Sequence, residues 1–575
     1  MRDANFFTHP IGNWQRRYEA LRASFVERLS DAVVADRFGY KTSYIRLLKH
    51  LFRTGKFDFH EPPPDQEGKV ARRRVSQEIR RKIRAWREKR LSAGEITQLL
   101  SQENIDISVR TVERVLAEEG FEKLPRRTQI KIGMTVAGTT VPDKAQIVTL
   151  TTLDGRRFES ETAGIFLFAP FITQLGLNEV VQEAGLPGTK AIPALSYLLS
   201  FLAVKLLGTE RYAHVGDDHG FDSGLGVFAG LNVLPKCTAM STYSYSLDEV
   251  HIRRLQEAFV KRAVKLGLYG GPVVNMDFHT MPHFGDESVL EKHWAGARNK
   301  VLKGALTLVA QDAESKLWLY TTSDIQRCEA DDQVLQFLNF WRTVRRGVAP
   351  TFVFDSRFTT YQKLSQLNND GVKFITLRRR GEKLMQNIDM SACWRKIHIP
   401  HVKRKFPNPL VYESNVTLRG YQGEVRQLVV RGNGREKPAF LITNDFASDL
   451  ESIVGHYARR WRVENGIAEA VKFFHLNSMS SPILTKVHFD VALTMIADTL
   501  YTMLASKLRG FEDCDAPKIY RHFIRGKGIV SVKGSNITVS FPRRSHNPIL
   551  RAVPWENLPQ ALITHNGASI SMKFA

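Results

Sequence analysis

Two aspartates end predicted strands, a position from which carboxylates can hold a metal ion. Asp277 ends the run GPVVNMD, and Asp355 ends the run APTFVFD. In a mixed sheet these two strands can lie side by side, which would bring both carboxylates to neighbouring edges. Mg²⁺ prefers oxygen ligands, and two such ions can stabilise the attacking and leaving oxygens of a phosphodiester. The alternative, for either residue in isolation, is an Asp that caps a turn.

A third carboxylate, Glu464, lies in the segment DLESIVGHYARRWRVENGIAEAVKFFHL, which has helical spacing. At about 100° per residue, Tyr457, Arg460 and Glu464 fall on one face of that helix. One helix can therefore offer a metal ligand with a cation and a hydroxyl beside it. The alternative is a solvated helix whose core side chains are Tyr457, Val463 and Val471.

This segment resembles the signature of bacterial DDE transposases of the cut-and-paste insertion-sequence type. In that signature a Tyr, two residues, an Arg, three residues and a Glu are followed by a Lys, and Tyr457, Arg460 and Glu464 have this spacing. The family's Lys would fall at Val471, whereas Lys472 comes one residue later, about 80° off the shared face. The resemblance covers residues 270–505, under half of the chain.

The resemblance implies an RNase H-like fold and a set of catalytic residues. The implied ligands, for two Mg²⁺ ions or for Mn²⁺ as a substitute, are Asp277, Asp355 and Glu464. Tyr457, Arg460 and Lys472 would complete the catalytic set. No side chain need act as nucleophile, because water or a 3′ hydroxyl attacks the phosphodiester.

The elements predicted around the two aspartates agree with such a core. Three apolar runs, GPVVNMDFHT, GALTLVAQDA and KLWLYTTSD, predict consecutive antiparallel strands. A helix at 331–346, a strand in APTFVFDSR, a helix in TTYQKLSQLNN and a strand in VKFITLRRR follow. We therefore predict an α/β fold class, with an RNase H-like catalytic core that carries a β-strand-rich insertion and is preceded by all-α helix-turn-helix domains.

The insertion is predicted from strand patterns that precede the Glu helix, namely KIHIPHV, LVYESNVTL, VRQLVVRG and PAFLITND. Trp394 lies among basic residues in SACWRKIHIP. Because this insertion holds DNA near the cut in related transposases, we predict that Trp394 stacks on a base flipped from the duplex. The alternative, a Trp packed in the insertion's own small core, is the commoner fate of this residue type. Asp312, Asp324 and Asp445 sit at turns or strand ends and do not match the motif.

Two helix-turn-helix patterns precede the catalytic region. In SDAVVADRFGYKTSYIRLLKHL, apolar residues recur at helical spacing on both sides of Gly39. Further along, the segment from Lys69 to Arg90 holds 11 basic and two acidic residues, a net charge of +9. Two helices follow it in a homeodomain-like pattern. The second helix of each pair would enter the major groove. The predicted DNA-contacting residues are Thr42, Ser43, Tyr44, Arg46, Arg110, Thr111 and Arg114. The alternative is a pair of small bundles with solvated charged faces.

The composition favours a nucleic-acid partner. The net charge is +23, while 43% hydrophobic residues are ordinary for a folded protein, so disorder does not explain the charge. The four cysteines lack metal or disulfide spacing, which indicates a reducing compartment. Charged residues interrupt the most apolar stretches, and no signal peptide is recognisable, so neither a membrane span nor a membrane partner is predicted.

Together these patterns predict a transposase that binds double-stranded DNA, both element ends and target, as a homodimer in the cytoplasm of a bacterium, associated with the nucleoid. Two alternatives remain: a non-catalytic helix-turn-helix regulator, and an RNase H-like nuclease without joining activity. The predicted domains are 1–61 and 69–128 (helix-turn-helix), 129–268 (linker and helical domain), 269–380 (first part of the core), 381–445 (insertion), 446–510 (second part, with the Glu helix) and 511–575 (small C-terminal region).

Overall fold

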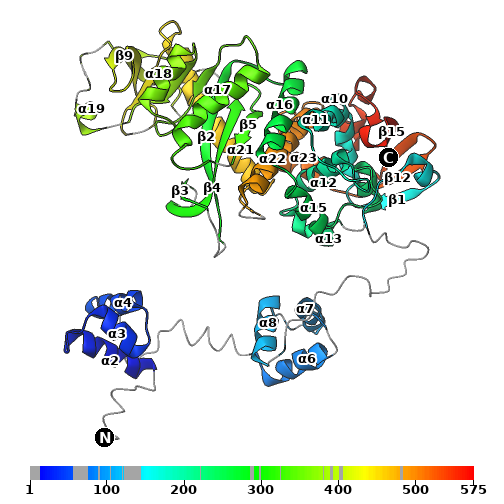
Figure 1. The fold of residues 1–575 in the computed structure, drawn as a ribbon, viewed down its shortest axis with the longest axis horizontal. Coiled ribbons are helices and arrows are strands. Elements are labelled where there is room, and N and C mark those ends of the chain that lie inside the picture. The colour runs from blue at the N-terminus through cyan, green and yellow to red at the C-terminus, as the bar shows by residue number, and fades with distance from the viewer. Residues whose placement is uncertain are drawn as a thin grey trace. The chain divides into compact units, whose positions relative to one another are not determined.

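The structure is a computed structural model, and the chain forms two compact units, residues 1–139 and 140–575 (Figure 1). It describes residues 13–55, 75–121, 144–284, 290–399 and 406–575, apart from 89–90, 104, 106, 120, 220–221, 297–298, 324, 380, 387, 389–390, 392, 435 and 480–482.

The first described segment is a three-helix bundle. Its helices are α2 (Asn13–Phe25), α3 (Asp31–Phe38) and α4 (Thr42–Arg53). Gly39 ends α3 with φ +67°, a left-handed conformation that glycine adopts without steric cost. Val34, Ile45 and Leu48 are buried between the helices, so the apolar spacing in the sequence marks the packed faces.

The second segment is another small bundle. It comprises α6 (Gln77–Glu88), α7 (Ala93–Gln102) and α8 (Val109–Glu118) around buried Ile83, Leu100 and Val112. The Ser108 hydroxyl caps α8 by accepting the Thr111 N–H at 3.3 Å. Arg80 of α6 forms ion pairs with Glu118 and Glu119 at the end of α8.

The core of the second unit is a ten-stranded sheet that follows the predicted order of elements. Strands β2, β4 and β5 are antiparallel, and β6 and β7 then run parallel to β2, giving the order β5-β4-β2-β6-β7. The prediction of three antiparallel strands followed by helix, strand, helix and strand is confirmed. Their bounds are β2 (Val273–Pro282), β4 (Lys300–Asp312), β5 (Trp318–Thr322), α17 (Gln333–Val344), β6 (Thr351–Val353), α18 (Tyr361–Asn369) and β7 (Lys373–Leu377).

The strand-rich segment after β7 extends the same sheet. Its strands are β8 (Arg395–Lys396), β9 (Leu410–Thr417), β10 (Glu424–Arg431) and β11 (Ala439–Thr443), preceded by α19 (Glu382–Gln386). β11 pairs with β7, where Leu441 lies opposite Leu377. The sheet therefore runs without a break from the core into this segment. A short strand that the sequence pattern did not predict, β3 (Lys292–Ala295), pairs with the first residues of β4.

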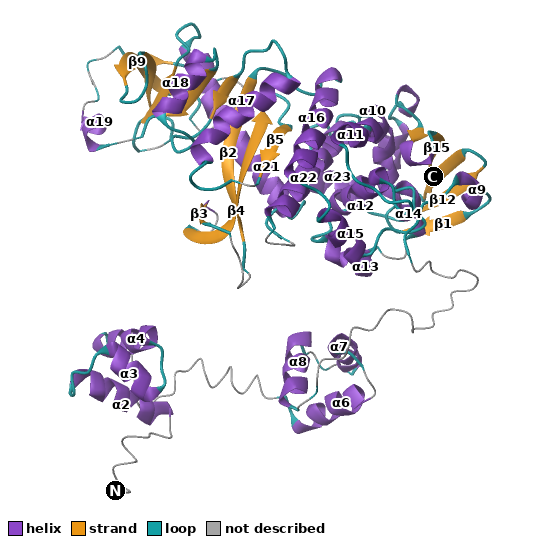
Figure 2. Ribbon diagram, viewed as in Figure 1, coloured by secondary structure: helices purple, strands orange, loops and turns teal. Residues whose placement is uncertain are grey.

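Helices cover this sheet (Figure 2). α20 (Leu450–Arg459) and α21 (Trp461–Lys472) follow β11, and α21 packs against β2 and β4. α22 (Leu484–Ala505) lies between β5 and the helices α12 (Ala194–Leu206) and α16 (Glu249–Lys265), and most of its side chains are buried. Apolar residues surround α22 on nearly all sides, which explains why its sequence is apolar throughout rather than along one stripe.

A second, five-stranded sheet joins residues 144–268 to the C-terminal region. Its order is β1-β12-β13-β15-β14, and β1 pairs antiparallel with β12. Both segments share one hydrophobic core with the large sheet and α22. The strands are β1 (Arg157–Ser160), β12 (Gly528–Lys533), β13 (Asn536–Phe541), β14 (Ala561–Leu562) and β15 (Ala568–Phe574).

The remaining helical elements are short and lie mostly in this shared core. They are α9 (Leu150–Leu153), η2 (Ala163–Phe168), α10 (Ala169–Gln174), α11 (Leu177–Ala184), η3 (Tyr212–His214), α13 (Val215–Asp218), α14 (Ser223–Phe228), α15 (Cys237–Ser244), η5 (Ala330–Asp332), α23 (Ala516–Ile519), η6 (Tyr520–Ile524), α24 (Asn547–Arg551), η7 (Trp555–Asn557) and η8 (Ile563–His565). Within the described part of the chain, no single helix is long and apolar enough to cross a membrane; a bent pair, Ala163–Gln174 with Leu177–Ala184, passes that test by length and composition only.

Candidate active site

The two predicted aspartates come together through the pairing of β2 with β6. These strands pair in parallel, with Asn275 opposite Val353. Asp277 and Asp355 each stand two residues beyond this last pair, and the charge of Asp355 acts on the Asp277 carboxyl, so the two carboxylates lie in the same region. Asp277 lies within β2 rather than at its end, since β2 continues to Pro282; what ends near Asp277 is the pairing with β6.

Glu464 reaches this pair through Arg460. The Arg460 guanidinium donates from Nη2 to Glu464 Oε1 at 2.5 Å, and its Nη1 lies 3.6 Å from Asp277 Oδ2. The Arg460 side chain is only 14% exposed, whereas that of Glu464 is 50% exposed. Arg460 also lies over the Tyr457 ring, 5.7 Å from its centroid. The structure thus brings together Asp277, Asp355, Glu464, Arg460 and Tyr457.

The helix that carries these residues is interrupted, so the prediction of one continuous helix is wrong at Arg460. α20 ends at Arg459 and α21 begins at Trp461. The Arg460 N–H donates to Tyr457 O, and the Val463 N–H donates to Arg460 O, so a tighter turn replaces the α-helical bonding there. Arg460 itself keeps helical dihedrals, φ −53° and ψ −37°. The shared face of the motif therefore survives the break.

The electrostatics of Asp277 show how closely the charges gather. Burial is the main cause that raises the pKa of Asp277 to about 6, and the negative charges of Glu464 and Asp355 raise it further, while Arg460 opposes them. For Arg460, burial disfavours the charged form, but Tyr457, Asp277 and Glu464 outweigh it, and its pKa is raised. A buried carboxylate among like charges is a group that a cation stabilises.

The donor set fits a divalent metal by its chemistry, although the side chains are not gathered as a cage. All three carboxylates offer oxygen, the ligand type of Mg²⁺ and Mn²⁺. Among the described residues, however, no cluster of three or more acidic, His or Cys side chains converges closely enough to hold an ion. Arg460 lies between two of these carboxylates, since it binds Glu464 and its Nη1 is 3.6 Å from Asp277 Oδ2.

Lys472 lies away from this centre. It is exposed at the end of α21, about two helical turns from Glu464. Its charge acts on Glu469: burial raises the pKa of Glu469, and Lys472 is among the cations that offset part of the increase.

Two polar residues of β2 that the sequence reasoning missed flank Asp277. Asn275 is completely buried, and its Nδ2 donates to the carbonyl of Arg459 at 3.5 Å, the carbonyl at the helix break. His279 Nε2 lies 2.7 Å from Asn477 Oδ1, and burial lowers the pKa of His279. Asn275, Asp277 and His279 alternate with Met276 and Phe278, so all three share one face of the strand. That alternation of polar residues inside an apolar strand was the available signal.

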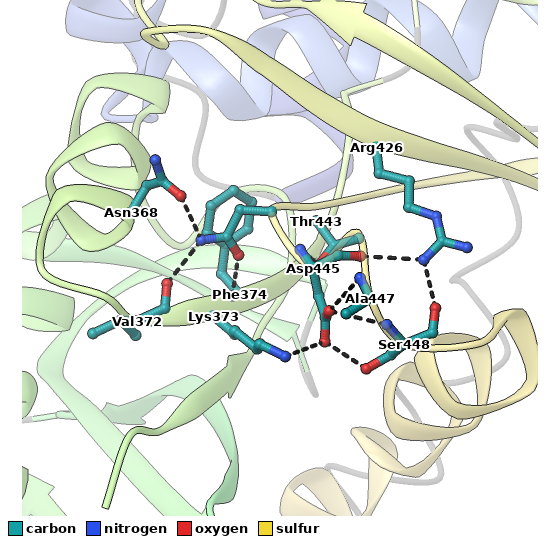
Figure 3. Close-up of polar contacts among 10 residues, drawn as sticks. Asn368, Val372, Lys373, Phe374, Arg426, Thr443, Asp445, Ala447 and Ser448 are labelled. Atoms are coloured by element: carbon teal, nitrogen blue, oxygen red, sulfur yellow. Dashed lines mark hydrogen bonds and ion pairs between the residues drawn. The ribbon is translucent and has the colours of Figure 1, made fainter. Parts of the chain in front are cut away.

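The carboxylates set aside in the sequence have structural roles where they are described. Asp445 accepts bonds from the N–H groups of Ala447 and Ser448, the Ser448 hydroxyl and Lys373 Nζ (Figure 3). Burial alone would raise the pKa of Asp445, but these partners hold it at about 2. Asp312 is fully buried and accepts from the backbone N–H of Glu314 and the backbone and hydroxyl of Ser315. Asp324 lies outside the described residues.

Trp394 packs inside the β-rich segment. Its ring meets Tyr412 edge to face with centroids 4.6 Å apart, and Arg431 lies 5.2 Å from the Trp394 centroid. It is partly buried against the small cluster around Tyr412, Val429 and Phe440. This placement favours the packing alternative over a base-stacking role.

The predicted DNA-contacting residues of the bundles differ in exposure. Ser43, Arg46, Arg110 and Arg114 are exposed, and Thr42 is partly exposed. Tyr44 packs partly into its bundle, and its ring centroid lies 5.1 Å from that of Tyr40.

Thr111 takes part in the N-cap of α8: its backbone N–H donates to the Ser108 hydroxyl, and its own hydroxyl lies 3.0 Å from that oxygen. Arg46 and Arg114 have ion-pair partners in Asp31 and Glu118. These residues would have to exchange such contacts for DNA.

A comparison with known families bears on this geometry. Residues 320–500 match the family model described as the transposase DDE domain. The match begins within β5 and ends within α22, so it contains Asp355, Arg460 and Glu464, while Asp277 lies before it. It fits an RNase H-like core and supports a transposase of the DDE type. No curated protein matches the chain.

Proposed function

We propose that the protein is a DNA transposase that binds the ends of its mobile element and catalyses Mg²⁺-dependent cleavage and strand transfer. One observation supports this proposal: Arg460 lies 3.6 Å from Asp277 and binds Glu464, while the charge of Asp355 acts on Asp277 from the end of the neighbouring strand β6. Two of these carboxylates fall in the segment that matches the transposase DDE domain.

Asp277, Asp355 and Glu464 would hold two Mg²⁺ ions, or Mn²⁺ in their place. Bound there, such ions supply the positive charge that activates water or a 3′ hydroxyl and stabilises the leaving oxygen. Arg460 orients the Glu464 carboxylate and screens it from Asp277. The Asn275 side chain donates to the Arg459 carbonyl and so ties the α20–α21 junction to β2, the strand that carries Asp277. Tyr457 completes the proposed set by supporting the guanidinium of Arg460. Lys472, about two helical turns from Glu464, would act in catalysis only through DNA bound beside the centre.

The proposed partner is double-stranded DNA, both the element ends and the target. The two N-terminal bundles would supply end recognition through Thr42, Ser43, Tyr44 and Arg46, and through Arg110, Thr111 and Arg114. The net charge of +23 favours a polyanion. We propose a homodimer in the DNA complex, no membrane partner, and a place in the bacterial cytoplasm with the nucleoid.

Incubation of the full-length protein with Mg²⁺ and the DNA that flanks its gene tests this function. Joined products are the expected outcome, and Mn²⁺ should replace Mg²⁺. Cutting without joining would mean a nuclease, and binding without cutting would mean a regulator.

A further inference from the structure

A short ribbon made of β3 and the start of β4 lies beside the end of β2 (Figure 1). The Thr280 hydroxyl donates to the Trp294 carbonyl at 2.9 Å, which ties β3 to β2. Gly304 allows the close approach of the strands, because a Cβ there would collide with the Met281 carbonyl. Thr280 is three residues from Asp277, so the Trp294 backbone lies within about 15 Å of Asp277 at roughly 3.3 Å per residue.

The two faces of this ribbon differ in a way that packing does not explain. On β3, His293 and Ala295 are buried, while Lys292 and Trp294 are exposed. Trp294 is opposite Val301 on β4, and these residues are 56% and 55% exposed. A soluble strand pair normally turns its large apolar residues inward. Here a Trp and a Val face outward as a cross-strand pair.

Beside that apolar pair stand two like charges. Lys292 is directly opposite Lys303, and both side chains are exposed. Like charges at directly opposite positions destabilise a strand pair. Residues two apart in a strand share a face, so both lysines place positive charge on the same face of the ribbon as Trp294 and Val301.

We propose that this face, consisting of Lys292, Lys303, Trp294 and Val301, is a DNA-contact surface next to the active site. The lysines contact phosphates, and Trp294 and Val301 contact sugar and base edges. A two-stranded ribbon is of the size that a DNA groove admits. A second copy of the chain using the same face would set lysine against lysine, so charge complementarity favours DNA. The inference rests on the proposed function, because it assigns DNA at that site.

The test uses the full chain and short duplexes of the DNA that flanks its gene. In the charge arm, Lys292→Gln/Lys303→Gln is compared with Lys190→Gln/Lys533→Gln, a pair of exposed lysines elsewhere in the same unit. The plot of log affinity against log salt concentration has a negative slope. We expect this slope to be shallower by about 2 for the ribbon variant, because each of two phosphate contacts contributes about 0.9. The control pair should keep the wild-type slope.

In the apolar arm, Trp294→Ala should weaken binding about tenfold, and Trp294→Phe should restore most of it because it keeps an aromatic ring. Neutral methylphosphonates within about five base pairs of the cut, roughly 17 Å at 3.4 Å per step, should abolish the difference between wild type and the lysine variant. Thermal unfolding checks that each variant folds.

The outcomes separate this inference from the proposed function. If the wild type cuts and joins DNA but the ribbon variants match the control pair, the inference fails and the function stands. If binding depends on the ribbon but no DNA is ever cut, the function fails and the contact surface stands. If the variants change the mass of the DNA-free protein in light scattering, the face binds a second copy and the inference is overturned.

Discussion

Replacement of Asp277 by asparagine should make the metal-free protein more stable, not less. In the folded chain the pKa of Asp277 is about 6, against an ordinary value of 3.8. The folded state therefore holds this proton more tightly than the unfolded state. Protonation of Asp277 therefore stabilises the folded state fully below about pH 4, and this stabilisation is lost as the pH rises through 6. Above pH 6, folding must keep a buried charge that asparagine does not carry.

The size of the effect follows from that difference. About two pKa units at 1.36 kcal/mol each amount to at most about 3 kcal/mol at pH 7.5. For a unit spanning residues 140–575, unfolding entropy converts this into a rise of about 3 °C in Tm. Calorimetry in EDTA should show the Asp277→Asn rise at pH 7.5 and little difference at pH 4. Added Mg²⁺ or Mn²⁺ should stabilise the wild type more than the variant and so close the gap.

Asp445→Asn is the matched control with the opposite sign. The pKa of Asp445 is held at about 2 in the folded chain. The ionised Asp445 carboxylate therefore stabilises the fold at pH values above the ordinary pKa of an aspartate, and this stabilisation is lost as the pH falls through 2. We expect Asp445→Asn to lower Tm at pH 7.5, corresponding to at most about 2 kcal/mol. A lower Tm for Asp277→Asn under the same conditions would refute the buried, carboxylate-surrounded environment of Asp277.

Three further predictions concern activity. An amide in place of any of the three carboxylates, such as Glu464→Gln, should abolish strand cleavage but leave DNA binding, whereas Asp312→Asn should cut normally, as gel assays of cleavage and binding would show. Residues 1–128 should carry most of the affinity for the element ends. In filter binding, Arg110→Ala or Arg114→Ala should weaken DNA binding by about 1–3 kcal/mol. The loss should depend on the DNA sequence if the arginine contacts a base, and should be the same for all sequences if it contacts a phosphate. Trp394→Ala should lower Tm by removing the contact with the Tyr412 ring, with normal second-strand cleavage on intact and pre-nicked ends; slow cleavage rescued by an abasic site would restore the stacking role.

Much of the core could be predicted from local patterns. The spacing of apolar residues predicts the strands β2, β4, β5, β6 and β7 and the helices between them. Each buried strand or helix face needs apolar residues at a fixed period, so the pattern is visible in the local sequence. The motif around Glu464 was likewise visible, since three side chains on one helix face depend on local geometry alone. The two bundles before residue 121 followed from the same periodicity.

Contacts between segments distant in sequence were decided only by the tertiary structure. β11 pairs with β7, and β1 pairs with β12. The local sequence pattern of a strand does not predict which other strand it pairs with. The same holds for the parallel pairing of β2 with β6, which brings Asp277 and the segment that carries Asp355 to the same region: a strand's apolar period predicts which face is buried but not which strand it pairs with. Asp277 and Asp445 make the point most sharply. They are the same residue type, Asp277 within β2 and Asp445 just after β11, yet the pKa of one is raised and that of the other is lowered. The difference comes from burial among like charges in one case and from N–H, hydroxyl and ammonium donors in the other, and those neighbours exist only once the chain has folded.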